Sequence, residues 1–273
     1  MTLGDILRAA GIRLSGPAAD GEAEALLRHV TGISRAALYC HLDQVIDAKA
    51  AEEYLRLVER LKNGEPLQYL TGHIEFFGLD FCVSPSVLIP RPATELMVER
   101  AIDIATGYSS SPVIADIGCG SGAVAVALAK HLPESSIVAL DISDEALELA
   151  GKNAVRHGCG NISFHKSDLL EMVSASHFDI ICANLPYVPA AECQSNHFEP
   201  QLALDGGIDG LDIIRRLVRQ ISEKNDKPDW LLLEFGTGQD TAVKAIIEAC
   251  LPRSHTEIFY DLIPVERVSV TRL

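Results

Sequence analysis

The second part of the chain alternates short apolar runs with helical patterns, and this alternation restricts the fold more than any other feature. Runs typical of buried strands follow residue 112, at 113–117, 137–140, 162–165, 178–183, 230–234, 258–261 and 267–273. Helical patterns separate most of them, at 124–129, 145–156, 211–221 and 240–250. Such alternation predicts a mostly parallel sheet with helices on both faces. The last two runs have no helix between them, so we expect an antiparallel pair at one edge.

The first 75 residues follow a different pattern. Apolar residues recur at helical spacing in three stretches, and Gly11, Gly16 and Gly32 are interpreted as turns between the helices. We therefore expect a small helical domain over residues 1–75. Residues 76–89 are aromatic and β-branched near a glycine turn, which predicts a β-hairpin linker, and residues 90–273 form the main domain.

A glycine-rich loop joins the first strand to its helix, and it consists of Asp116, Ile117, Gly118, Cys119, Gly120, Ser121 and Gly122. Glycine permits positive φ and lets a ligand approach the backbone closely. Dinucleotide folds use G-x-G-x-x-G to hold a pyrophosphate, whereas the order here is D-x-G-x-G-x-G. An acid before the glycines suits the cationic part of S-adenosylmethionine, directly or through water. The loop therefore resembles motif I of the class I methyltransferases, and we expect it to bind that cofactor.

Two further acids follow the next two strands. Asp141, with Ile142 beside it, ends the second strand, where a carboxylate can accept both ribose hydroxyls. Asp168 follows the third strand, and the resemblance implies that it meets the adenine while Leu169 lines the ring. Each acid alone also fits a helix cap or a turn. Acids at three successive strand ends favour a cofactor site.

The tetrapeptide Asn184-Leu185-Pro186-Tyr187 directly follows the fourth strand. It resembles the (D/N)-P-P-(Y/F) motif of methyltransferases that modify planar amide or amino nitrogens. The Asn184 side-chain oxygen and the Leu185 backbone carbonyl can each accept one N–H of an NH₂ group, which fixes the nitrogen for attack. Tyr187 can stack on the planar acceptor. We expect all four residues to be catalytic and Asn184 to touch the cofactor as well, the alternative being a tight turn.

A wider resemblance covers nearly the whole chain. Segments 64–72, 75–78, 88–95, 199–211 and 234–239 are similar to the protein-glutamine N5-methyltransferases that modify peptide-chain release factors, the HemK/PrmC family. The I-P-R-P-x-T-E run at 89–95 is specific, whereas motif I is shared with many unrelated methyltransferases. The resemblance implies a class I, Rossmann-like α/β fold: a seven-stranded, mostly parallel sheet and a small N-terminal helical domain, joined by a β-hairpin.

The same resemblance implies a reaction and a partner. A methyl group passes from S-adenosyl-L-methionine, which becomes S-adenosyl-L-homocysteine, to the amide nitrogen (N5) of a glutamine. That glutamine belongs to the Gly-Gly-Gln motif of peptide-chain release factors. Residues 1–75 are then expected to bind the release factor.

Charge and cysteine content exclude several other classes of function. The formal net charge of −15 argues against broad nucleic-acid binding, which needs clustered Lys and Arg. Seven cysteines, an odd count with no C-x-x-C pair, indicate reduced core thiols rather than a metal site or disulfides. No apolar run approaches the roughly 20 residues that span a bilayer, and no signal peptide is visible. We therefore expect a cytoplasmic protein without a metal. The sequence does not fix the oligomeric state, and a monomer in contact with its large partner is the expected one.

Leu185 is the one clear departure from the family pattern, because the family usually has Pro there. Leucine still offers its carbonyl, but it adds an N–H and frees φ. Asn-Leu-Pro-Tyr is also typical of rRNA adenine N6-dimethyltransferases, which are the alternative enzyme. The net charge, segment 89–95 and the N-terminal position of the helical domain oppose that alternative. A non-catalytic cofactor-binding protein is the other alternative; a degraded glycine loop or a missing Asn184 would favour it, and neither is seen.

Overall fold

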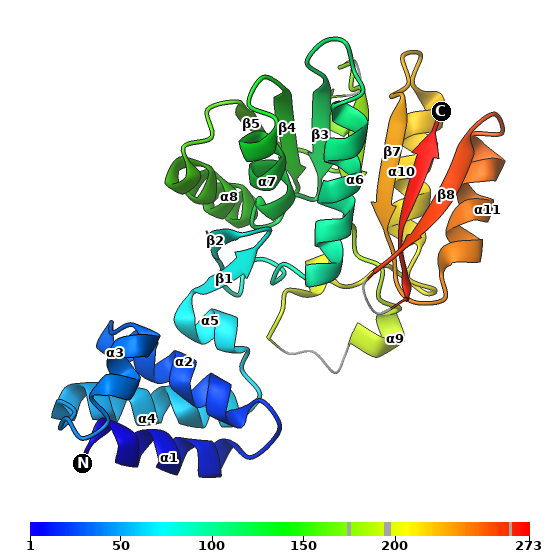
Figure 1. Ribbon diagram of the computed structural model, residues 1–273. Helices are drawn as coiled ribbons and strands as arrows, with labels where there is room; N and C mark the ends of the chain where they lie inside the picture. The colour runs from blue at the N-terminus through cyan, green and yellow to red at the C-terminus, as the bar shows by residue number, and fades with distance from the viewer. Residues whose placement is uncertain (174–175, 194–197, 262–263) are drawn as a thin grey trace. The chain divides into compact units, whose positions relative to one another are not determined.

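The computed structural model describes residues 1–173, 176–193, 198–261 and 264–273, and the chain divides into two compact units, Met1–His73 and Ile74–Leu273 (Figure 1). The first unit is helical, with α1 (Leu3–Leu14), α2 (Ala19–Thr31), α3 (Arg35–Cys40), α4 (Ala48–Lys62) and α5 (Leu67–Thr71). Buried side chains from all five of these helices, among them Ile6, Leu26, Leu38, Tyr54 and Leu70, form its own hydrophobic core.

Helix α1 shows how local sequence sets the bounds of these helices. The Thr2 hydroxyl accepts the Asp5 N–H at 3.2 Å, and the Asp5 carboxylate accepts the Thr2 N–H at 3.1 Å. This reciprocal capping box satisfies N–H groups that have no partner within the helix. The interpretation of Gly11 as a turn is wrong: α1 continues through it to Leu14, and Ser15 leaves the helix with φ of 44°.

A β-hairpin opens the second unit. Strands β1 (His73–Phe76) and β2 (Leu79–Cys82) form a two-stranded sheet, and only Phe77 and Gly78 lie between them, with φ of 51° and 70°. Two successive positive φ values are the geometry of a tight hairpin turn. The buried rings of Phe76 and Phe81 pack into the core of this unit, which attaches the hairpin to it.

The main sheet has the predicted class I arrangement. It contains β3 (Val113–Ile117), β4 (Ser136–Asp141), β5 (Ile162–Lys166), β6 (Ile180–Ala183), β7 (Trp230–Glu234), β8 (His255–Tyr260) and β9 (Glu266–Arg272). The strand order of this 7-stranded sheet is β5-β4-β3-β6-β7-β9-β8, and β9 pairs antiparallel with both neighbours while the other pairings are parallel. The expected antiparallel edge pair is confirmed. Within it β9, the later strand in the chain, lies next to β7, and β8 forms the edge.

Helices cover both faces of the sheet because residues alternate between the faces along each strand. Ile114 of β3 packs into one core with α6 (Glu95–Ala105), α7 (Ala123–His131) and α8 (Asp144–His157). Ala115 and Ile117 pack into a second core with α10 (Asp212–Glu223) and α11 (Asp240–Cys250). Short helical turns complete the unit: α9 (Ala190–Cys193) and the 3₁₀ turns Pro92–Thr94, Glu171–Val173 and Gln201–Ala203.

The carboxyl ends of the central strands meet at one edge. Ile117 at the end of β3 lies beside Leu140 of β4 and Ala183 of β6. The chain connections lead away from β3 in opposite directions at this point, and such a switch point is where open α/β sheets bind ligands. Within the described ranges, no helix is long and apolar enough to cross a membrane, and no three His, Cys, Asp or Glu residues are grouped to hold a metal ion. All seven cysteines are free; Cys40 is exposed, so it is not the core thiol that was expected.

Candidate active site

A cavity of about 780 Å³ opens at the carboxyl ends of β3 to β6. This volume lies within the range of pockets that bind small molecules and cofactors. Its lining includes most of the residues singled out in the sequence: Asp116, Gly118, Cys119, Gly120, Ser121, Asp141, Ile142, Asp168, Leu169, Asn184, Leu185 and Pro186. Gly122 and Tyr187 are not part of that lining.

The glycine loop has the backbone conformation that its residues suggested. Gly118, Gly120 and Gly122 have φ of 73°, 53° and 77°, a region that favours glycine. A Cβ at Gly122 would lie 2.9 Å from the Ala150 Cβ, so this glycine lets α7 approach α8. A Cβ at Gly120 would meet nothing within 4 Å, which leaves its backbone open to a ligand. The three glycines therefore have different structural roles.

Asp141 holds the loop from the neighbouring strand. Its carboxylate accepts the N–H of Gly120 at 2.8 Å and that of Ser143 at 2.9 Å. Burial raises the pKa of Asp141, and these backbone N–H donors oppose the rise. A carboxylate oxygen can accept a second hydrogen bond, so Asp141 can hold the loop and still accept from a ribose.

Asp116 is buried beneath the loop. Its Oδ2 accepts the N–H of Ala125, in the first turn of α7, at 3.0 Å. Burial raises the pKa of Asp116 to about 7, with a further contribution from the negative charge of Asp141 and an opposing one from the Ala125 N–H. A buried carboxyl next to a cavity is stabilised in its charged form by a cation. This environment suits the positively charged portion of a ligand.

The third acid has a protein partner. Asp168 forms an ion pair with Arg216 of α10 at 2.7 Å, and both residues line the cavity. Leu169 is buried with φ of 52°, an uncommon conformation for leucine. Ile142 is exposed at the cavity wall. These apolar side chains offer surfaces on which a planar ring could lie.

Asn184 is oriented by a partner far away in the sequence. Its Nδ2 donates to the hydroxyl oxygen of the buried Thr94 at 3.1 Å. Among the described residues, the Asn184 side-chain oxygen accepts no hydrogen bond, so it stays available at the cavity. The bond to Thr94 thus determines which end of the amide meets a ligand.

Leu185 connects the acceptor motif with the glycine loop. Its side chain is buried, and its Cδ2 lies 3.2 Å from the place where a Cβ of Gly118 would be. Any larger residue at 118 would therefore press on Leu185.

Tyr187 directly follows Pro186 of the cavity lining but is not part of that lining. Its side chain is half-buried, and its hydroxyl donates to Oε1 of Glu234 at 3.1 Å. Burial raises the pKa of Tyr187, and the Glu234 carboxyl raises it further. The expected stacking of Tyr187 on an acceptor stays a prediction.

Several residues of the site were not assigned a role from the sequence. Thr94 lies in the specific run at 89–95, and Glu234 is a charged residue that ends an otherwise apolar strand, so each carried a signal. Arg216 lies on an exposed helix surface and carried no such signal.

Asn153 is fully buried in α8, where its Nδ2 donates to the carbonyls of Ser121 and Cys82 at 2.8 and 3.0 Å. It thereby ties the glycine loop to the hairpin.

Two family models match the chain. The model described as PrmC N-terminal domain matches residues 5–72, and a methyltransferase domain matches residues 109–231. A protein named release factor glutamine methyltransferase from Geobacter sulfurreducens is 41% identical over 81% of this chain and 78% of its own length. One of the same name from Koribacter versatilis is 38% identical over 92% of this chain and 90% of its own length.

Solved structures share the fold at low sequence identity. The hMettl16 catalytic domain in complex with MAT2A 3′UTR hairpin 6 has a TM-score of 0.59 at 15% identity, covering 82% of this chain and 81% of that one. The ribosomal protein L11 methylase from Lactobacillus delbrueckii subsp. bulgaricus has a TM-score of 0.51 at 20% identity, covering 70% of this chain and 83% of that one. These likenesses concern the architecture alone.

Proposed function

Because this chain belongs to the release factor glutamine methyltransferases, we propose that it methylates the side-chain amide nitrogen (N5) of the glutamine in the Gly-Gly-Gln motif of a release factor. The methyl donor is S-adenosyl-L-methionine. The observation that carries the proposal is the orientation of Asn184, whose amide nitrogen is bound by Thr94 and whose oxygen is left at the cavity. An oxygen in that place can accept an N–H from a primary amide.

The residues of the cavity fit this donor. The open backbone at Gly120, the carboxylate of Asp141 and the buried Asp116 offer surfaces for a ribose and for positive charge. When bound, S-adenosyl-L-methionine supplies an electrophilic methyl group and leaves as S-adenosyl-L-homocysteine. We assign the donor's contacts to Asp116, the glycine loop, Asp141 with Ile142, Asp168 with Leu169, and Asn184.

The chain's own part in the reaction is to orient the acceptor. An amide nitrogen is a weak nucleophile because its lone pair is delocalised into the carbonyl group. The Asn184 oxygen and the Leu185 carbonyl each accept one N–H of the glutamine, which holds its nitrogen in one place and favours its electron-rich form. One N–H proton of the amide passes to water after the nitrogen has been methylated, so no strong base is needed.

We assign binding of the release factor to the N-terminal helical unit. This unit has a hydrophobic core of its own, and the match to the PrmC N-terminal domain over residues 5–72 supports a separate role. We also infer that the chain acts as a monomer in the cytoplasm, where release factors work.

The two alternatives fit less well. An rRNA adenine methyltransferase is not favoured, because the relatives act on a release factor by name and the net charge is −15. A non-catalytic binding protein would not need Asn184 to be oriented toward the cavity.

Mass spectrometry tests the proposal directly. A purified release factor incubated with the protein and S-adenosyl-L-methionine should gain the mass of one CH₂ on the Gly-Gly-Gln peptide. A release factor with asparagine in place of that glutamine is the control and should gain nothing. Methylated adenine in rRNA, with no change in the release factor, would contradict the proposal.

A further inference from the structure

Glu234, the last residue of β7, and Gln239, in the loop after it, have no role in the reaction as described so far, yet both form hydrogen bonds with Tyr187. Tyr187 is the last residue of the acceptor motif. It emerges from β6, and β6 pairs with β7, so the two loops leave the sheet side by side. Gly236 lies between these two residues and donates its N–H to Gln239.

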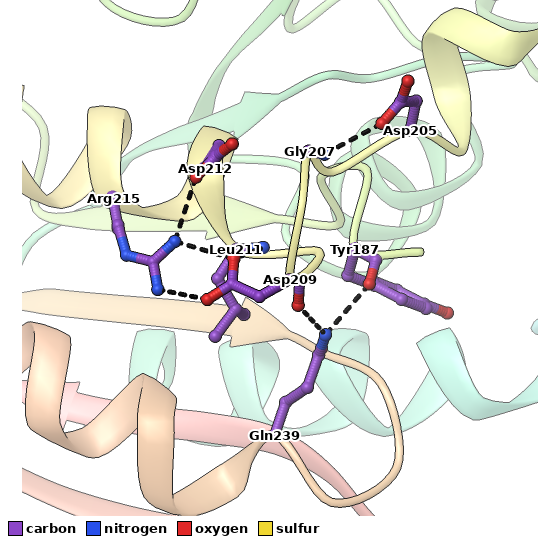
Figure 2. A network of polar contacts seen from close by, with 8 residues as sticks. All are labelled: Tyr187, Asp205, Gly207, Asp209, Leu211, Asp212, Arg215 and Gln239. Atoms are coloured by element: carbon purple, nitrogen blue, oxygen red, sulfur yellow. Dashed lines mark hydrogen bonds and ion pairs between the residues drawn. The ribbon is translucent and has the colours of Figure 1, made fainter. Parts of the chain in front are cut away.

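Gln239 holds the backbone of Tyr187. Its Nε2 donates to the Tyr187 carbonyl oxygen at 3.0 Å and to the Asp209 carbonyl oxygen at 3.3 Å, as Figure 2 shows. Its Oε1 accepts the Gly236 N–H at 2.7 Å. Both ends of the amide are therefore used, and a carboxylate of the same shape could not replace the two donated bonds.

Two glycines make these contacts possible. A Cβ at Gly210 would overlap the Tyr187 carbonyl oxygen and would lie 2.7 Å from Gln239 Nε2. A Cβ at Gly236 would lie 3.0 Å from Gln239 Oε1 and 3.4 Å from Cδ2 of the Tyr187 ring. A side chain at Gly210 would push Gln239 and the Tyr187 backbone apart, and one at Gly236 would crowd the Gln239 amide.

Glu234 holds the other end of the same tyrosine. It is fully buried at the end of β7, and its Oε1 accepts the Tyr187 hydroxyl at 3.1 Å. Its Oε2 has no hydrogen-bond partner among the described residues. Burial raises the pKa of Glu234, and the nearby hydroxyls of Thr94 and Tyr187 oppose the rise. A fully buried carboxyl at the end of an apolar strand costs stability, which favours a functional reason for its presence.

Tyr187 is thus held at its carbonyl and at its hydroxyl. This matters because Leu185 lacks the fixed φ that a proline would give the turn. We propose that Glu234, Gly236 and Gln239 are positioning residues for methyl transfer, which hold Tyr187 and so fix Asn184 and the Leu185 carbonyl at the acceptor. The inference rests on the proposed function and deepens it.

The test compares methyl transfer to a purified release factor in Gln239→Glu, Glu234→Ala and Glu234→Gln. Gln239→Glu and Glu234→Ala should lower kcat by about 10- to 100-fold, because a small misplacement of the acceptor slows transfer that strongly. Glu234→Gln keeps an oxygen for the Tyr187 hydroxyl and should restore most of the activity. The matched control is Thr241→Ala, an exposed position early in α11, which should leave kcat unchanged.

Calorimetry with S-adenosyl-L-methionine separates positioning from a general structural role. Positioning predicts nearly unchanged cofactor affinity in the variants with low kcat. Unchanged kcat in Gln239→Glu and Glu234→Ala would overturn the inference. A fall in kcat that is matched by equal losses of cofactor affinity and thermal stability would overturn it too.

A second measurement does not depend on the substrate. The N–H groups of Val188 and Ala190 donate to the carbonyls of Leu204 and Gly207, so hydrogen exchange reports on this segment. Exchange at residues 184–190 should become faster in Gln239→Glu, while exchange at 116–122 should not change. If the unaltered protein methylates no release factor, the proposed function fails. Hydrogen exchange in Gln239→Glu then decides by itself whether Gln239 holds the segment 184–190 in place. Unchanged exchange overturns the positioning role.

Discussion

Asp116→Asn is expected to make the protein more stable at neutral pH and weaken its binding of the cofactor. The carboxyl of Asp116 is buried, and burial raises its pKa from 3.8 to about 7. The backbone N–H of Ala125, which donates to it at 3.0 Å, can also donate to the oxygen of an asparagine. The substitution therefore removes the charge and preserves the shape.

The magnitude follows from the pKa shift. A rise from 3.8 to about 7 is about three units, and each unit corresponds to about 1.4 kcal/mol. Ionising Asp116 in the folded protein thus lowers the free energy of unfolding by at most about 4 kcal/mol. The NH₂ group of the asparagine has no assured partner, and burying it costs about 1–3 kcal/mol. We expect a net gain of about 1–3 kcal/mol for Asp116→Asn above neutral pH.

How stability changes with pH depends on whether the folded or the unfolded protein binds the proton of Asp116 more tightly. The folded protein binds this proton more tightly, because the pKa of Asp116 is higher in the folded state. The cost of ionising Asp116 is therefore absent below about pH 4, grows between about pH 4 and about pH 7, and reaches its full size above about pH 7. Asparagine has no such dependence. The stability advantage of Asp116→Asn should therefore be larger at about pH 8 than at about pH 5. Chemical denaturation of both proteins at the two pH values measures it.

The cofactor should respond in the opposite way. A cationic ligand prefers ionised Asp116, so affinity in the unaltered protein should fall by up to about tenfold for each pH unit below about 7. In Asp116→Asn this pH dependence should disappear and the affinity at neutral pH should be lower. If the variant gained no stability at about pH 8 and kept the same affinity profile, the assigned burial cost and charge contact would both be wrong.

Three further predictions test other parts of the structure. Asn184→Ala should abolish methyl transfer and leave S-adenosyl-L-methionine affinity by calorimetry largely intact; equal loss of both would contradict the acceptor role. Gly122→Ala forces a Cβ to within 2.9 Å of Ala150 at φ of 77°, so its unfolding free energy should fall by about 1–3 kcal/mol; an unchanged melting temperature would show that α7 and α8 can separate freely. Removing residues 1–72 should impair methylation of a whole release factor more than that of a short glutamine peptide, and the reverse ranking would refute the partner role.

Much of the sheet could be predicted because period and length distinguish its elements. Helix α11 begins and ends at Asp240 and Cys250, the bounds that its apolar pattern suggested. The short helices α3 and α5, of 6 and 5 residues, are too brief to show a period. Gly11 was misinterpreted because Ile6 and Ala10 keep α1 packed in the core, and tertiary packing outweighs the roughly 1 kcal/mol cost of a helical glycine.

The site was predicted only in part, for a related reason. Motifs show residues that are neighbours in sequence, such as the glycine loop. The partners that orient them lie far away: Thr94 is 90 positions from Asn184, and Glu234 is 47 positions from Tyr187. Apolar patterns carry no information on such pairs. The order of β8 and β9 in the sheet could not be predicted for the same reason, because an alternating pattern does not specify which strands pair with each other.

Strand β9 lies between β7 and β8 although it follows both of them in the chain. While the protein folds, β7 therefore keeps an unpaired edge until residues 266–272 arrive. That edge belongs to an apolar strand, Trp230–Glu234, and such edges recruit strands from other molecules. Changes that delay the β8–β9 hairpin should therefore reduce the yield of soluble protein through aggregation, even where the finished fold is as stable as before.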